Sequence, residues 1–225
     1  MKYLFFLFVI NSFVFTVYSQ DATEALSKII EKYNTVDDYK VNVKVVADVP
    51  MIKILPSKAT IYFKQKNKFK IVSKGIVLLP KQGFSDLFEF LAKPSNYMAV
   101  FGSYETINQI KTRIVNVIPN AASNEIILAK LWIDEKSNLI IKAQLTTKGN
   151  GTLLTYYEYT DVKYGLPSKM TVEIEVKKFK LPKSVASDIN NTKKTKEKQK
   201  KKGTIIIYLT DYTVNSGLDD KLFTK

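Results

Sequence analysis

Paired carboxylates can perform acid–base chemistry, and the sequence holds three candidate pairs. Two are adjacent Asp residues at 37–38 and 219–220, and the third is Glu173 with Glu175, two residues apart. Carboxylates work as acid and base when their surroundings separate their pKa values. Successive Asp side chains diverge in turns, where Asp is common because it bonds the local backbone. Glu173 and Glu175 share a predicted strand face, and Lys177 and Lys178 beside them indicate an ion-paired wet surface.

Other catalytic groups are scarce. The sequence contains no histidine, the commonest general base and metal ligand, and no cysteine, so it has no thiol nucleophile and no disulfide. It contains no Gly-rich phosphate loop and no nucleophile elbow. We therefore predict a protein without catalytic residues, metal site or cofactor, whose stability comes from burial. An enzyme acting on lipids is the most distant alternative.

The charge of the chain comes almost entirely from lysine. The formal net charge is +14, and Arg113 is the only arginine. Nucleic-acid readers usually rely on arginine forks, so we predict no nucleic-acid partner. The lysine-rich residues 184–202 are polar and lack aromatics, and they are predicted to form a flexible surface loop between the last two strands. Docking of this loop to anionic lipid headgroups is the alternative, with about 1 kcal/mol per lysine.

The first residues resemble an export signal. Lys2 precedes an apolar run that continues to about Phe15, and Val17 and Ser19 suit a cleavage site. We predict a cleavable signal peptide at residues 1–19, with an uncleaved anchor as the alternative. Because no cysteine follows, lipid anchoring is not expected. Residues 20–225 then form one exported domain with room for a core.

Hydrophobic periodicity predicts a mainly β (α+β) fold. Residues 21–33 have the spacing of an amphipathic helix, with Thr23 or Asp21 as its cap. From Tyr39 onward the period changes to two, and successive strands are joined by hairpin turns, as expected for an antiparallel sheet. A short helix begins at Ser85 and ends before Pro94. Several strands are apolar on both faces, so both faces need cover, either by a filled core or around a cavity.

Four segments of the sequence resemble one known family. They are Ile61–Ile71 (IYFKQKNKFKI), Leu131–Leu145 (LWIDEKSNLIIKAQL), Tyr159–Glu175 (YTDVKYGLPSKMTVEIE) and Ile205–Phe223 (IIIYLTDYTVNSGLDDKLF). Their order resembles the LolA/LolB-like outer membrane lipoprotein-sorting proteins of Bacteroidota-type bacteria. The resemblance implies a single curled antiparallel sheet, an incomplete β-barrel, with an N-terminal helix and an inserted helix covering an apolar cavity.

The resemblance also implies a function and a site. It implies a monomeric periplasmic carrier that shields lipoprotein acyl chains between an inner-membrane donor and an outer-membrane acceptor. Strand parity and helix face select the expected cavity lining: Val43, Val45, Ile61, Phe63, Phe69, Ile71, Leu87, Phe88, Leu91 and Trp132. In the family, an arginine at the position of Gln65 latches the lid helices, and Gln65 departs from this pattern. The alternatives are a binder of other lipids and an exported structural or adhesion domain with a filled core.

Overall fold

The protein is described by a computed structural model over most of its length. The described residues are 21–50, 55–65, 68–75, 84–120, 126–148, 151–175 and 202–224. The predicted signal peptide (1–19), residues 66–67 and all of the predicted lysine-rich loop except Lys202 lie outside them. No helix in these described ranges has the length and apolarity needed to cross a bilayer.

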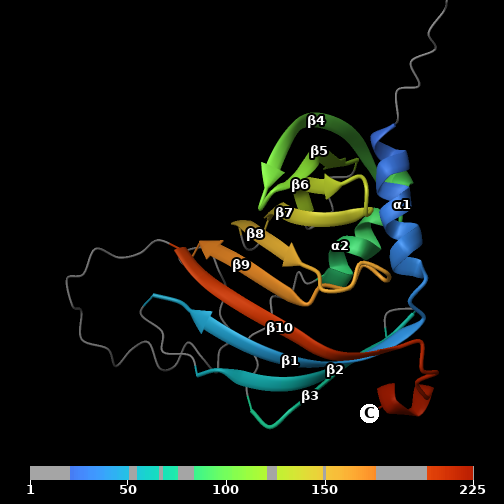
Figure 1. Cartoon of the computed structure of the whole chain (residues 1–225), viewed down its shortest axis with the longest axis vertical. Helices are drawn as coiled ribbons and strands as arrows, with labels where there is room; N and C mark the ends of the chain where they lie inside the picture. The colour runs from blue at the N-terminus through green and yellow to red at the C-terminus, as the bar shows by residue number, and fades with distance from the viewer. Residues whose placement is uncertain are drawn as a thin grey trace, which may run out of the picture.

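The described strands form one antiparallel sheet in the order β3-β2-β1-β10-β9-β8-β7-β6-β5-β4. The strands are β1 (Asp38–Asp48), β2 (Ser57–Lys64), β3 (Lys68–Ser73), β4 (Tyr97–Ile107), β5 (Ile110–Pro119), β6 (Ile126–Asp134), β7 (Leu139–Thr147), β8 (Gly151–Glu158), β9 (Lys169–Glu175) and β10 (Lys202–Val214). Figure 1 shows the sheet curling without closing into a barrel. The predicted fold class is confirmed: an open, curled antiparallel sheet accompanied by two α-helices.

The strand order explains why a helix lies inside the curl. Neighbouring strands are consecutive in the chain except β1 and β10, so β3 and β4 are the two free edges. The chain must therefore run from one edge to the other between these two strands. Helix α2 (Phe84–Leu91) and the 3-10 turn η1 (Pro94–Asn96) lie in this connection. In Figure 1, α2 lies within the curl of the sheet.

Helix α1 (Ala22–Asn34) covers the same face of the sheet as α2. The Asp21 side chain caps it by accepting a hydrogen bond from the Thr23 backbone N–H at 3.0 Å. Its apolar stripe buries Ala22, Ala25, Leu26 and Ile29 against the sheet, as the helical spacing predicts. We call the sheet face beneath α1 and α2 the inner face, and the opposite face the outer face.

The C-terminal segment ties the ends of β1, β2 and β3 together. The buried carboxylate of Asp38 accepts hydrogen bonds from the backbone N–H groups of residues 216, 217 and 218 and from the Ser216 hydroxyl. Desolvation opposes ionisation, but these donors outweigh it and lower the pKa of Asp38. Within the closing turn η3 (Asp220–Phe223), Asp220 pairs with Lys64 and Lys68 at 2.8 and 2.7 Å.

Candidate functional site

The inner face is apolar across almost the whole width of the sheet. Strand registers align one residue from each of eight strands into a continuous row. The row consists of Ala47, Ile205, Val172, Thr155, Ala143, Leu131, Val115 and Phe101. All are buried except Ala47 and Phe101, which are partly buried and pack against the same cluster. The inner face therefore forms one dry surface that spans eight strands.

The centre of this surface carries short side chains. Ala129 and Ala143 are fully buried there, although each side chain reaches only one carbon above the sheet. Groups from the helices must come down to cover them, because interiors pack at the density of organic crystals. Three apolar residues of α2, Leu87, Phe88 and Leu91, belong to the same buried cluster. Helix α2 therefore covers part of the inner face.

Buried side chains, ring contacts and a hydrogen bond hold α2 in place. The Phe88 ring lies 4.5 Å from the Tyr33 ring of α1, and the Phe90 ring lies 5.4 Å from the Tyr97 ring. The Tyr97 hydroxyl donates to the Leu91 carbonyl at 2.9 Å at the end of the helix. Burial, with a smaller contribution from Glu89, raises the pKa of Tyr33 to about 12, so its hydroxyl stays neutral. An eight-residue helix is unstable alone, so α2 depends on these neighbours.

The predicted lining residues of β1 and β2 lie together on the inner face. Val43, Val45 and Ile61 are buried in the main cluster, and Phe63 is buried against the rings of Tyr33 and Tyr39. The helix residues Leu87, Phe88 and Leu91 join the same cluster, as described above. The alternation along β1 and β2 was enough to select these inward side chains.

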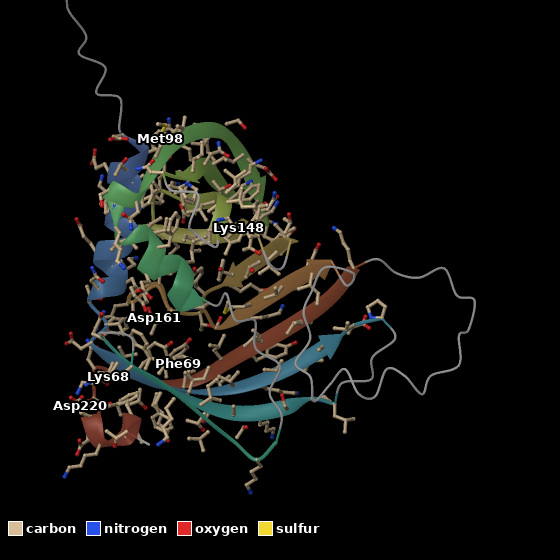
Figure 2. All side chains as sticks on the ribbon, turned by 180° about the vertical axis from the view of Figure 1, so that it is seen from behind. Lys68, Phe69, Met98, Lys148, Asp161 and Asp220 are labelled. Carbon is tan, nitrogen blue, oxygen red and sulfur yellow. The ribbon has the colours of Figure 1, made fainter. Side chains whose placement is uncertain are left out.

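Two predicted lining residues are exposed instead of buried. Phe69 pairs with Phe63 and Ile71 pairs with Ile61, so both lie on the inner face as their parity predicts. However, 47% of Phe69 and 42% of Ile71 remain accessible. The prediction that they share the buried side is wrong in this respect, because β3 is an edge strand with a neighbour on one side only. Figure 2 shows Phe69 beside Lys68 and Asp220 at this end of the molecule.

Trp132 is not part of the inner-face cluster. Leu131 and Ile133 take the inner positions of β6, so Trp132 lies on the outer face. There its indole N–H donates to the Glu105 carboxylate at 2.7 Å, and the Lys142 ammonium lies 4.0 Å from its ring. This second, smaller cluster also contains Ile107, Ile114, Leu139 and Ile141. The expected inner position of Trp132 is corrected, because apolar neighbours on both sides hid its parity.

Gln65 bonds to the chain near α1 and not to a helix. Its side-chain amide donates to the Val36 carbonyl at 2.9 Å, and its backbone N–H donates to the Asp37 carbonyl at 2.7 Å. Both acceptors lie between α1 and β1. Gln65 thus fixes the exit of α1 onto the end of β2.

The remaining chemistry of the described residues is structural. Within the described ranges, no cluster of three His, Cys, Asp or Glu residues could bind a metal. The carboxylates of Asp38 and Asp220 are bound by the C-terminal segment and by lysines, respectively.

Sequence reasoning missed a hollow of about 270 Å³ beside α1, lined by Ala25, Lys28, Ile29, Ile133, Glu135 and Asn138. Its mixed polar lining distinguishes it from the inner face.

Comparison with known proteins identifies the fold. No family model matches the sequence, and no curated protein is significantly similar to it. A crystal structure of a DUF1329 family protein from Desulfovibrio piger covers 91% of this chain and 98% of its own, with a TM-score of 0.61 and 13% identity. The LolA superfamily protein NE2245 from Nitrosomonas europaea covers 92% and 99%, with a TM-score of 0.55 and 14% identity.

A third solved structure leads to the same assignment. It is a putative outer membrane lipoprotein-sorting protein domain from Vibrio parahaemolyticus, which covers 90% of this chain and 96% of its own, with a TM-score of 0.54 and 10% identity. At these identities the likeness is one of architecture: a curled open sheet with helices on its inner face. The chain therefore has a LolA-like fold.

Proposed function

We propose that the protein is a periplasmic, non-enzymatic carrier that holds the acyl chains of lipidated proteins against its inner face. The observation that carries this proposal is the apolar inner face, which extends over β1 and β2 and ends in the exposed side chains of Phe69 and Ile71 on β3. Exposed aromatic and aliphatic groups on the same face as the buried cluster are what a binding face needs where its ligand enters at an open edge.

The energetics favour such a shelter. Each buried methylene contributes about 0.8 kcal/mol, so a sixteen-carbon tail left in water forfeits about 12 kcal/mol. A lipidated protein can cross an aqueous compartment only if another protein covers that tail. The covering protein needs no catalytic group, which agrees with a sequence that lacks histidine and cysteine.

Room for the tail would come from α2. The side chains of Leu87, Phe88 and Leu91 share the inner face with the short side chains of Ala129 and Ala143. When α2 moves outward, the acyl chain takes the place of its apolar side chains, and the buried area lost with the helix is regained with the ligand.

The experiment is a direct search for lipid. Protein purified from the periplasm is extracted with organic solvent and analysed by mass spectrometry, and lipid-free protein is titrated with an environment-sensitive fatty-acid probe. We expect co-purified acyl chains and saturable probe binding. Lipid masses other than those of lipoproteins would identify another lipid cargo. Absence of both lipid and probe binding would favour the exported structural or adhesion domain.

Donor and acceptor partners belong to the same proposal. The carrier would act as a monomer that receives its cargo at the inner membrane and releases it at the outer membrane. Transfer of a fluorescent lipoprotein from donor to acceptor membranes, with and without the protein, measures this step.

A further inference from the structure

The outer face of β1 and β2 carries lysines that lack acidic partners. Lys40 and Lys44 of β1 and Lys58 of β2 alternate with buried residues and point away from the inner face. Lys44 and Lys58 are directly paired across the two strands. All three side chains are exposed, and none forms an ion pair with any residue in the described part of the chain. We call these three residues the lysine face.

The acidic residues near this face form no ion pair with its lysines. Asp211 accepts hydrogen bonds from the Asn42 amide and the Thr210 hydroxyl, and Asp48 lies at the far end of β1. On β9, Lys169 is compensated by Glu158 at 2.8 Å. Three positive charges without an ion partner among the described residues therefore lie together on β1 and β2, in a chain whose net charge is already +14.

Aromatic and apolar groups border the lysine face. Tyr62 lies beside Lys40 in the register, with the Lys40 ammonium 6.0 Å from its ring, and Tyr208 is paired with Lys44 and is exposed. At the edge of the sheet, Val72 of β3 is 49% exposed on the outer face. Tyrosine next to lysine is the combination found where proteins meet a lipid–water interface.

The edge strand β3 exposes apolar side chains on both of its faces. Phe69 and Ile71 are exposed on the inner side, and Val72 is exposed on the outer side. A partner protein would have to clamp both sides of one strand to cover these groups. A fluid apolar medium covers both at once. This arrangement distinguishes a bilayer from an acidic protein as the occupant of the surface.

We propose that the lysine face and the β3 edge form a docking surface for anionic bilayers, with the lysines on the headgroups and Phe69, Ile71 and Val72 in the interfacial layer. This surface lies on the opposite side of the sheet from most of the inner face, so docking stands without the carrier function. If both hold, docking brings the exposed end of the inner face to the membrane, where an acyl chain enters or leaves.

The test compares two full-length variants that lose the same charge. One carries Lys40→Gln, Lys44→Gln and Lys58→Gln, and the control carries substitutions to glutamine at the exposed residues Lys93, Lys111 and Lys136. Binding is measured by flotation with vesicles of phosphatidylglycerol and phosphatidylcholine, and with vesicles of phosphatidylcholine alone, at low and at high salt. The lysine-rich loop remains in every protein, so it cannot produce a difference between them.

We expect the lysine-face variant to bind the anionic vesicles about 100-fold more weakly at low salt, since three headgroup contacts are lost. The control variant should bind like the unchanged protein, and high salt should remove the difference. Equal losses in both variants would show that only net charge matters, and unchanged binding in both would assign docking to the loop. Either result, or equal binding to neutral vesicles, overturns the proposal. Fatty-acid probe binding is measured on the same proteins, so a failed carrier function would be seen separately.

Discussion

Phe63 and Phe69 are directly opposite each other on β2 and β3, yet 2% of Phe63 is exposed and 47% of Phe69 is exposed. The two rings have the same parity and lie on the same face. They differ only in that β2 has neighbours on both sides whereas β3 is the edge of the sheet. The boundary between interior and solvent therefore falls between these two strands, and the apolar face continues across it.

A charge introduced on β3 should affect fatty-acid probe binding differently on the two faces of the strand. Ile71 and Val72 are neighbours on one strand with exposures of 42% and 49%, but only Ile71 lies on the inner face. We expect Ile71→Asp to weaken fatty-acid probe binding at least about 10-fold, because the charge would be desolvated by the tail. Val72→Asp should leave probe affinity unchanged, and equal effects in a fluorescence titration would contradict entry over β3.

The hydrogen bond between Tyr97 and α2 should control the opening of the helix. Tyr97→Phe removes the bond to the Leu91 carbonyl and should loosen α2 by about 1 kcal/mol. Amide hydrogen exchange in α2 should become faster, and the fatty-acid probe should bind with a higher association rate. Tyr159→Phe is the control, since it removes a similar bond, donated to the Ile140 carbonyl of β7 and not to α2. If both variants accelerate probe binding equally, α2 is not the gate.

Asp38 should make the fold acid-sensitive. Its pKa is lowered in the folded state, so the stabilisation is present above the unfolded value and is lost as pH falls through the folded pKa. We expect the free energy of unfolding to decrease below about pH 5 in chemical denaturation. Asp38→Asn should cost about 2 kcal/mol at neutral pH and flatten this dependence, because four donors lose their charged acceptor. An unchanged pH profile in the variant would assign the acid sensitivity to other groups.

Trp132 should contribute to the stability of the fold, and its fluorescence should not respond to lipid binding. It is the only tryptophan, and it lies in the outer cluster with its N–H on Glu105. Its emission maximum should stay constant during titration with a non-absorbing fatty acid. Trp132→Phe should lower the free energy of unfolding by about 1 to 3 kcal/mol and leave probe affinity unchanged. A shift in emission on lipid binding would return Trp132 to the binding face.

Much of the architecture could be predicted because alternation and helical spacing are local properties. Residues Val41, Val43 and Val45 alternate with Lys40, Asn42 and Lys44, and this pattern alone predicts which side of β1 is buried. The same argument failed for Trp132, where Leu131 and Ile133 are apolar too. Where every position of a strand is apolar, the sequence does not indicate which side chains face inward.

Contacts between residues far apart in the chain could not be predicted from the sequence. Asp38 and the backbone of residues 216–218 are far apart in the chain, and nothing in either segment indicates that they meet. Both Asp pairs were predicted to be solvated turn residues. The structure gives Asp38 a buried structural role and pairs Asp220 with Lys64 and Lys68, because the strand order brings the C-terminus to the end of β1 and β2.

Composition and periodicity alone predict a mainly β chain without histidine or cysteine, in which most strands have one strongly apolar face. The folded sheet determines which strands are the free edges, places α2 on the inner face, and leaves Phe69 and Ile71 exposed. Side-chain direction depends on the local backbone, whereas burial depends on which neighbours the whole sheet supplies.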